Sequence, residues 1–249
     1  MQNVKNSLVL FDVDGTLTES RQMISKDMIE ALRELSHTTE IGLLTGSGLE
    51  YIKEQLWPLF ADREISINCH VLPCNSTEYY IPNPDSPGSF IEIFRTSMED
   101  KVGFEKFQLI MKTIISQQAK IAEADYDIPF TGHHFQNRGS MINWSPIGRN
   151  ANNGSRQQFI AMDKTYQIRS RHINMFRRLM LDEGVEDVTI KLGGDTSFDI
   201  YPTGWDKTFV LKHFPESDWD VIFVGDRCGP NGNDHELYEH LRHQERSFE

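Results

Sequence analysis

Ser7-Leu-Val-Leu-Phe-Asp-Val-Asp-Gly-Thr-Leu-Thr18 places a short apolar run directly before two aspartates that are two residues apart. The apolar run predicts a buried strand, and the polar residues after it predict a turn. Asp12 and Asp14 would then lie at the carboxyl edge of a parallel sheet, where open α/β sheets bind ligands. Two carboxylates this close repel each other unless a cation neutralises them. Mg²⁺ is the expected cation, because it binds one or two protein carboxylates together with water and phosphate oxygens.

Gly15 allows the backbone to turn close to a phosphate, and nearby N–H groups could cradle the phosphate oxygens. A plain Asx-type turn after a strand is the simpler alternative. We favour this alternative less, because the match to a cation and phosphate site extends over the whole string from Asp12 to Thr18 and is not limited to the two aspartates.

On either side of this stretch, apolar patterns alternate between strand and helix. Residues 25–35 carry apolar side chains at helical spacing, and residues 40–44 form a second short apolar run. A further helix follows, with Leu49, Ile52 and Leu56 on one face. Strand, helix, strand and helix in this order predict parallel βαβ units.

Residues Pro82–Gly88 contain three prolines and a glycine, a composition typical of a linker. The elements expected after this linker are mixed: strands at 90–94, around Phe135, and at 141–144, 188–192 and 197–201, with helices at about 99–122 and 167–181. The βαβ pattern returns with a helix at 205–213 and a strand at 220–224. The sequence therefore predicts an α/β fold: a Rossmann-like core with a parallel sheet, residues 1–85 and 204–249, interrupted by an inserted α+β cap, residues 86–203.

Three further pieces fit the same edge of the sheet. Thr45-Gly46-Ser47 ends the second strand at a helix N-terminus, where its hydroxyls could donate to a phosphoryl oxygen, although a plain helix cap explains it equally well. Asp226 ends the strand at 220–224 and would add a third carboxylate. Lys207 could offset the charge between an aspartate and a transferred phosphoryl group, although a lysine at a helix start is usually solvated.

One segment of the predicted cap is positively charged, whereas the chain as a whole is acidic. Residues 133–178 contain eight basic residues and only Asp163 as an acid, a net charge of 8 − 1 = +7 within a chain of −12. For Arg169–Arg178 we prefer a solvated helix face. Arg138, Arg149 and Arg156 lie in a Gly/Asn/Ser-rich stretch typical of loops that present side chains, and they suggest an anion site.

The composition limits the classes of partner that the protein is expected to bind. The net charge of −12 argues against nucleic acid and against an anionic membrane. No apolar run is long enough for a spanning helix, and the first residues lack the features of a signal peptide. Cys69, Cys74 and Cys228 give no disulfide framework and suit a reducing compartment, so we expect a cytoplasmic protein that binds small molecules.

Taken together, the four motifs resemble those of the haloacid dehalogenase (HAD) superfamily of phosphotransferases. Four longer strings are similar to the eukaryotic-type phosphomannomutase family, and the similarity runs from Leu8 to about Leu237. These strings are Arg138-Gly-Ser-Met-Ile-Asn-Trp-Ser-Pro-Ile-Gly-Arg149, Gly193-Gly-Asp-Thr-Ser-Phe-Asp-Ile-Tyr-Pro202, Gly204-Trp-Asp-Lys207 and Gly232-Asn-Asp-His-Glu236.

The resemblance implies a role for each matching residue. Asp12 would be the nucleophile and Asp14 the general acid/base, while Mg²⁺ would be bound by Asp12, the backbone carbonyl of Asp14, and Asp226. Thr45 or Ser47, with Lys207, would hold the transferring phosphoryl group. The remaining matches are substrate contacts: Arg21, Arg138, Arg149, Arg156, Ser197 and Asp199.

The activity implied by the resemblance is the interconversion of mannose 6-phosphate and mannose 1-phosphate, which feeds GDP-mannose synthesis. A hexose 1,6-bisphosphate would be both activator and intermediate, and an arginine cluster would hold its distal phosphate. The cap of this family often mediates dimers, so a homodimer through the cap is also an expectation. The sequence departs from the family pattern at Pro73-Cys-Asn-Ser76, where the family has Pro-Glu-Asn-Gly.

Two other functions stay open at this stage. A Mg²⁺-dependent sugar-phosphate phosphatase would form the same aspartyl phosphate and discharge it to water. A non-catalytic anion-binding protein would need Asp12 and Asp14 to be inert, which the intact motif disfavours.

Overall fold

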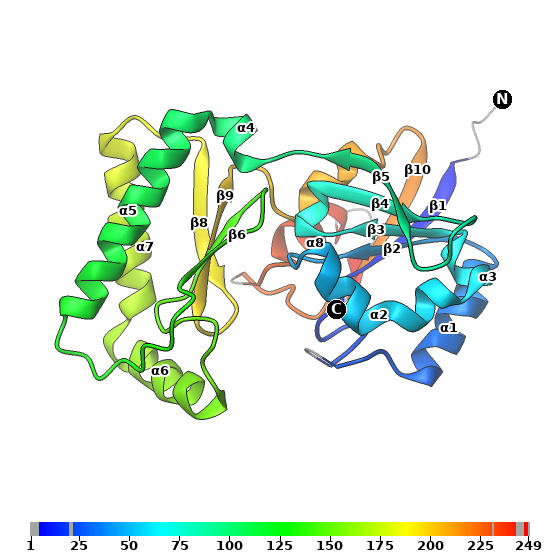
Figure 1. Ribbon diagram of the computed structural model, residues 1–249. Helices are drawn as coiled ribbons and strands as arrows, with labels where there is room; N and C mark the ends of the chain where they lie inside the picture. The colour runs from blue at the N-terminus through cyan, green and yellow to red at the C-terminus, as the bar shows by residue number, and fades with distance from the viewer. Residues whose placement is uncertain (1–4, 20–21, 231, 243–246, 249) are drawn as a thin grey trace. The chain divides into compact units, whose positions relative to one another are not determined.

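The computed structural model describes all residues except 1–4, 20–21, 231, 243–246 and 249. The chain divides into two compact units (Figure 1). The core unit comprises Met1–Arg95 and Gly204–Glu249, and the cap unit comprises Thr96–Thr203.

The core unit contains a seven-stranded sheet in the order β11-β10-β1-β2-β3-β4-β5. Five strands are parallel and two, β4 and β5, pair antiparallel at one edge. The strands are β1 (Asn6–Phe11), β2 (Glu40–Leu44), β3 (Cys69–Leu72), β4 (Glu78–Pro82), β5 (Phe90–Arg95), β10 (Trp219–Val224) and β11 (Ser247–Phe248). The predicted parallel α/β core is confirmed.

Helices cover both faces of this sheet. They are α1 (Lys26–Ser36), α2 (Leu49–Ala61), α3 (Arg63–Ser66), α8 (His235–Arg242) and the 3₁₀ helix η2 (Lys207–Lys212). Apolar residues of α1 and α2 pack with Ile41 and Leu43 on one face. Those of η2 and α8 pack with Leu8 and Leu10 on the other. Burial on both faces explains why these strands are continuous apolar runs.

The Pro-rich segment is a turn within the core sheet and not a linker to the cap. It joins β4 to β5, which pair antiparallel from Pro82 opposite Phe90 to Glu78 opposite Arg95. Residues 86–95 therefore belong to the core unit, and the predicted boundary at residue 86 moves to residue 96. Proline and glycine mark hairpin turns and linkers alike, so composition alone could not separate the two.

The cap unit is a four-stranded antiparallel sheet with helices, as the predicted α+β cap required. Its sheet has the order β6-β7-β9-β8. The strands are β6 (Phe135–Asn137), β7 (Ile142–Trp144), β8 (Val188–Gly193) and β9 (Ser197–Pro202), and the helices are α4 (Met98–Val102), α5 (Phe104–Glu123), α6 (Asn153–Tyr166) and α7 (Ile168–Asp182). The single helix expected at 99–122 is two helices, because Gly103 has a φ of +84° that ends the first. Helix α6 was not predicted.

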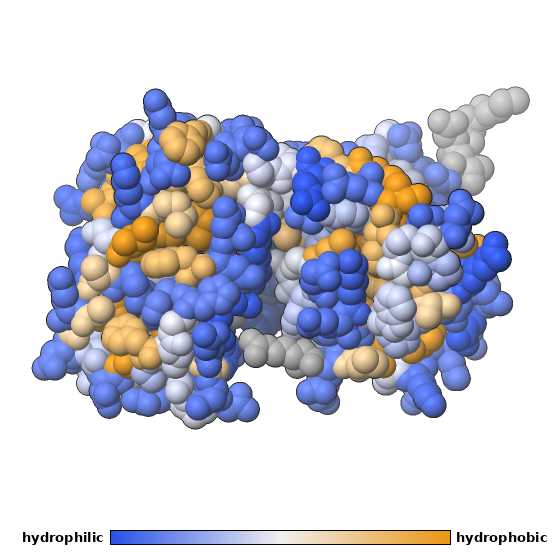
Figure 2. Space-filling model, viewed as in Figure 1, coloured by the Kyte–Doolittle hydropathy of each residue, from blue (hydrophilic) through white to orange (hydrophobic). Residues whose placement is uncertain are grey.

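Alternation along the cap strands separates an apolar face from a polar one. Ile142, Trp144, Phe198 and Ile200 belong to a core cluster that includes residues of α5 and α7. The residues between them point to the opposite face. Hydrophilic residues dominate the face of the molecule that Figure 2 shows, with apolar residues in smaller patches. Among the described residues, no helix has the length and apolar character needed to cross a membrane.

A left-handed turn follows β3. Cys74, Asn75 and Ser76, which form the short segment η1, have φ values of 52°, 56° and 63°. Left-handed backbone is unfavourable for residues with a Cβ, and glycine adopts it at little cost. Ser76 is fully buried and its hydroxyl has no hydrogen-bond partner, so its side chain brings no visible compensation.

We therefore expect Ser76→Gly to raise the free energy of unfolding by about 1 kcal/mol, because glycine relieves the left-handed strain and removes a buried unpaired hydroxyl. Urea denaturation followed by circular dichroism measures the change. Ser36→Gly is the matched control: Ser36 is also buried, but it ends α1 and its hydroxyl donates to the carbonyl of Arg33 at 2.7 Å. That variant should be destabilised by about 1 kcal/mol. Destabilisation of both variants would contradict the strain argument.

Candidate active site

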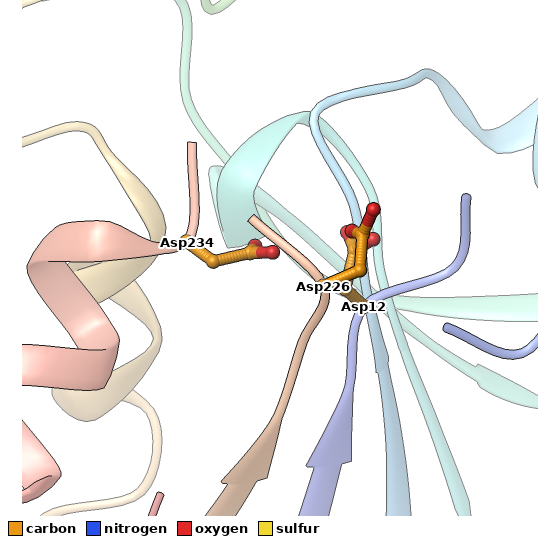
Figure 3. Close-up of side chains that lie close together, drawn as sticks. All are labelled: Asp12, Asp226 and Asp234. Atoms are coloured by element: carbon orange, nitrogen blue, oxygen red, sulfur yellow. The ribbon is translucent and has the colours of Figure 1, made fainter. Parts of the chain in front are cut away.

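Three aspartates come together at the carboxyl edge of the core sheet (Figure 3). Asp12 follows β1 and Asp226 follows β10, and these neighbouring parallel strands end in register with Phe11 opposite Val224. Asp234 precedes α8. One carboxylate oxygen of each aspartate lies within 4.8 Å of those of the other two. The predicted pair of Asp12 and Asp226 is thus observed, and Asp234 joins it.

Lys207 lies between two of these aspartates. Its ammonium group donates hydrogen bonds to Asp12 Oδ1 and to Asp234 Oδ1. All three side chains are buried, with Lys207 only 1% exposed. The other oxygen of Asp234 accepts a hydrogen bond from the backbone N–H of Arg227 at 2.9 Å. The usual expectation of a solvated lysine at a helix start does not apply here, because two carboxylates compensate its burial.

Burial, together with the neighbouring charges, changes the ionisation of these groups. Burial raises the pKa of Asp12 to about 6, Asp234 adds to the rise, and Lys207 opposes it. Burial also raises the pKa of Asp226, again with a contribution from Asp234. For Lys207, burial acts to lower the pKa, but Asp12 and Asp234 outweigh it and raise the pKa. The lysine therefore stays charged, and further positive charge would favour the ionised form of Asp12.

The donor set fits a hard divalent cation. The three carboxylates and the one ammonium sum to a net charge of −3 + 1 = −2. Asp226 is exposed, whereas Asp12 and Asp234 are buried beside the lysine. Oxygen ligands with access to water are the ligands that Mg²⁺ prefers. Gly15 is required beside them, because its φ is +96° and a Cβ there would lie 2.3 Å from Asp226 Oδ2.

Asp14 is half-buried, and its side chain turns to helix α2. Its Oδ1 accepts a hydrogen bond of 3.0 Å from the hydroxyl of Tyr51. One turn later on the same helix, Gln55 Oε1 accepts a hydrogen bond of 2.9 Å from the hydroxyl of Thr18. Helix α2 therefore contacts the loop that carries both catalytic candidates.

The loop Thr45–Ser47 lies between β2 and α2, at the same edge of the sheet. Thr45 is buried and its hydroxyl accepts a hydrogen bond of 3.1 Å from the N–H of Ser47, which is half-buried. The N–H groups of Asn75 and Cys74 donate to the carbonyls of Thr45 and Ser47 at 2.8 and 2.9 Å.

The side-chain amide of Asn75 also donates to the carbonyl of Trp205 at 3.3 Å, two residues before Lys207. The left-handed turn η1 thus connects the hydroxyl loop to the segment that carries the lysine.

In the cap, polar side chains form a row across the sheet. Gln136, Asn143, Asp199 and Lys191 are successive register partners on β6, β7, β9 and β8. Directly paired residues share a face, so these four lie on the face opposite the cap's apolar core.

Asn143 is buried and links the predicted substrate contacts in this row. Its Oδ1 accepts from Arg149 Nη1 at 2.7 Å, and its Nδ2 donates to Asp199 Oδ1 at 2.7 Å and to Ser197 Oγ at 3.1 Å. The structure therefore brings Arg149, Ser197 and Asp199 into one network. A Cβ at Gly193 would lie 2.7 Å from the carboxyl carbon of Asp199, so that site needs glycine.

Two more of the predicted arginines lie next to this network. Arg156, in the first turns of α6, donates to the hydroxyl of Thr196 at 3.1 Å, and Thr196 precedes Ser197. Arg138 follows β6 and donates to Gln136 Oε1 at 3.4 Å. Both guanidinium groups thus reach residues in or beside the polar row.

Arg169 differs from the solvated helix face that we expected. It is buried, pairs with Asp163 at 2.6 Å, and donates to the carbonyl of Gly194 at 2.9 Å. These contacts tie Arg169 to the turn between β8 and β9, and the carboxylate of Asp163 balances the charge of the buried guanidinium group. Arg171, Arg177 and Arg178 are exposed, as expected.

Sequence reasoning did not identify three residues of these sites, and Arg21 lies outside the described residues. Asp234 could have been found, because it belongs to the string Gly232–Glu236 and lies immediately before an amphipathic helix. Tyr51 and Asn143 carried no signal of their own, since their importance comes from contacts with Asp14 and Asp199, which are distant in the chain.

Comparison with known proteins identifies the family of this chain. A model of the eukaryotic phosphomannomutase family matches residues 28–248. Phosphomannomutase of Schizosaccharomyces pombe is 36% identical over 234 residues, which are 93% of this chain and 85% of that protein. Phosphomannomutase 2 of Dictyostelium discoideum is 34% identical over 244 residues, 97% of this chain and 90% of that protein.

Solved structures show the fold. An N-terminally truncated IMP-nucleotidase of Plasmodium falciparum superposes with a TM-score of 0.65 at 13% identity, covering 93% of this chain and 64% of that one. Trehalose-6-phosphate phosphatase of Aspergillus fumigatus gives a TM-score of 0.51 at 15% identity, covering 98% and 81%. The chain thus shares its fold with these proteins, and the match of the family model and of the relatives over most of the chain shows that this protein belongs to the eukaryotic phosphomannomutase family.

Proposed function

We propose that this protein is a Mg²⁺-dependent phosphomannomutase that interconverts mannose 6-phosphate and mannose 1-phosphate. The observation that carries the proposal is family membership: relatives named phosphomannomutase match at 34–36% identity over the core and the cap together. A hexose 1,6-bisphosphate would phosphorylate the enzyme and would also be the intermediate of each cycle.

Asp12 is the proposed nucleophile. One of its carboxylate oxygens forms a bond to phosphorus while the bond between phosphorus and the sugar oxygen breaks, and Asp14 gives a proton to that oxygen. In the second half-reaction, Asp14 takes the proton of the other sugar hydroxyl, which attacks phosphorus and regenerates the Asp12 carboxylate. Lys207 holds the Asp12 carboxyl group by its hydrogen bond and offsets charge beside the transferred phosphoryl group.

Asp12, Asp226 and the backbone carbonyl of Asp14 would hold Mg²⁺, while Asp234 would serve mainly as the partner of Lys207. This division follows from the contacts: both oxygens of Asp234 already accept hydrogen bonds, from Lys207 and from the Arg227 N–H. When bound, Mg²⁺ supplies positive charge to the phosphoryl oxygens. Thr45 or Ser47 would donate to the same oxygens.

The cap would hold the phosphate that is not reacting. Arginine forks onto phosphate oxygens, and Arg138, Arg149 and Arg156 all reach the polar row of the cap sheet or a residue beside it. Ser197 and Asp199, in the same network, would contact sugar hydroxyls. The solved phosphatase structures resemble this chain only in fold, at 13–15% identity, whereas relatives named phosphomannomutase match at 34–36%, so we favour the mutase.

Removal of the metal tests the core site. Activity should vanish in EDTA and return with Mg²⁺, and Asp226→Ala should raise the Mg²⁺ concentration for half-maximal activity by about tenfold or more. A second readout, the shift in melting temperature on adding Mg²⁺, should be reduced in the same variant. Asp85→Ala, which removes an exposed carboxylate from the turn between β4 and β5, should behave like the parent protein. Full activity in metal-free buffer would exclude the site as proposed.

Substrate comparison tests the cap. Arg149→Ala should lower kcat/KM for a hexose bisphosphate by about 10² or more, because a charge-assisted pair of hydrogen bonds to the distal phosphate is lost. The same variant should retain its activity on a small aryl phosphate, which has no second phosphate. Arg171→Ala, an equal charge change at an exposed cap position, should affect neither substrate. Equal losses of Arg149→Ala on both substrates would favour the phosphatase.

A further inference from the structure

Helix α2 contacts the loop between Asp14 and Thr18 through two polar side chains one turn apart. Tyr51 donates to Asp14 Oδ1 at 3.0 Å, and Gln55 accepts from the hydroxyl of Thr18 at 2.9 Å. Residues four apart on a helix lie one above the other, so both contacts come from one stripe of α2. This stripe is distinct from the apolar face of Leu49, Ile52 and Leu56.

The loop itself is closed by its own backbone. Asp14 and Thr18 form a parallel bridge, and the N–H of Gly15 donates to the carbonyl of Thr18 at 2.7 Å. Thr18 and Gln55 are buried, which makes their contact a fixed part of the fold. The backbone of this loop is therefore held at both ends, and the Tyr51 hydroxyl is a donor from outside the loop that contacts the side chain of Asp14.

We propose that Tyr51 is a positioning residue for proton transfer by Asp14. Its hydroxyl donates to one carboxylate oxygen and so fixes the rotation of the carboxyl group about its Cβ–Cγ bond. A general acid acts only when its proton lies within hydrogen-bond reach of the leaving oxygen, so this rotation determines the rate. The inference rests on the proposed function of Asp14 as general acid/base.

The location of Tyr51 gives the contact a further consequence. Tyr51 lies in the first turn of α2, four residues after Ser47 in the loop proposed to bind the phosphoryl group. Helix α2 thus carries the group that orients the proton donor, and it begins directly after the loop proposed to hold the phosphoryl oxygens. A shift of α2 would change the distance between the Tyr51 hydroxyl and Asp14 and would also move the end of the loop that carries Ser47.

Comparing substrates with different leaving groups distinguishes a loss of acid orientation from a general loss of activity. A hexose oxygen needs a proton when it leaves phosphorus, whereas 4-nitrophenolate leaves without one. Tyr51→Phe should lower kcat/KM for hexose 1,6-bisphosphate by about tenfold and change kcat/KM for 4-nitrophenyl phosphate less than about twofold. Tyr79→Phe is the matched control: it removes a hydroxyl that contacts His70 Nδ1 at 2.8 Å, outside the site, and should show no such contrast.

A double-mutant cycle tests whether Tyr51 acts through Asp14. Asp14→Asn should show the same leaving-group contrast at larger size, about 10²-fold or more, and adding Tyr51→Phe to it should cost nothing further. If Asp14→Asn shows the contrast and Tyr51→Phe slows both substrates equally, or still costs tenfold in the Asp14→Asn background, the positioning role is wrong while the function of Asp14 stands. If Asp14→Asn itself shows no contrast, the proposed role of Asp14 fails and the role of Tyr51 fails with it.

Discussion

A buried ammonium group between two buried carboxylates is the interaction on which the candidate active site depends. Lys207 cannot be buried without Asp12 and Asp234, since an unpaired buried charge costs on the order of several kcal/mol. Asp12 comes from the first strand, and Lys207 and Asp234 from the final fifth of the chain. The ion pairs therefore form only when both segments of the core unit have come together, which links assembly of the site to folding of that unit.

The same interaction explains why we propose different roles for the acids at this edge of the sheet. Lys207 neutralises one negative charge and leaves an excess of two, which matches the charge of the divalent cation that we propose binds here. Asp234 is saturated by the lysine and a backbone N–H, whereas Asp226 is exposed. In the cap, the polar site depends on strand alternation. The alternation that buries Trp144 and Phe198 on one face of the sheet places Asn143 and Asp199, with the arginines, on the other face.

The sequence predicted the fold and the residues that lie beside a strand end, and it failed where function depends on contacts between distant segments. Asp12 and Asp226 were identified because short apolar runs show where strands stop. Arg138 and Arg149 lie in loops, as the composition of their stretch predicted, but Arg156 lies in helix α6, so the loop prediction was wrong for that residue. Tyr51 and Asn143 were missed because a tyrosine on a helix and an asparagine in a strand acquire their importance from distant residues, Asp14 for Tyr51 and Asp199 for Asn143. The cap boundary was misplaced because a proline-rich hairpin turn has the composition of a linker, and Arg169 was misjudged because its partner Asp163 is hidden in the preceding helix.

The most direct test of the account follows the fate of the phosphoryl group from mannose 1-phosphate. Purified protein with Mg²⁺ is given this substrate with and without a catalytic amount of hexose 1,6-bisphosphate, and mannose 6-phosphate and inorganic phosphate are measured together. The account predicts that mannose 6-phosphate accumulates to equilibrium, that the bisphosphate strongly accelerates its formation, and that little inorganic phosphate appears. Stoichiometric release of inorganic phosphate at a rate independent of the bisphosphate would contradict it.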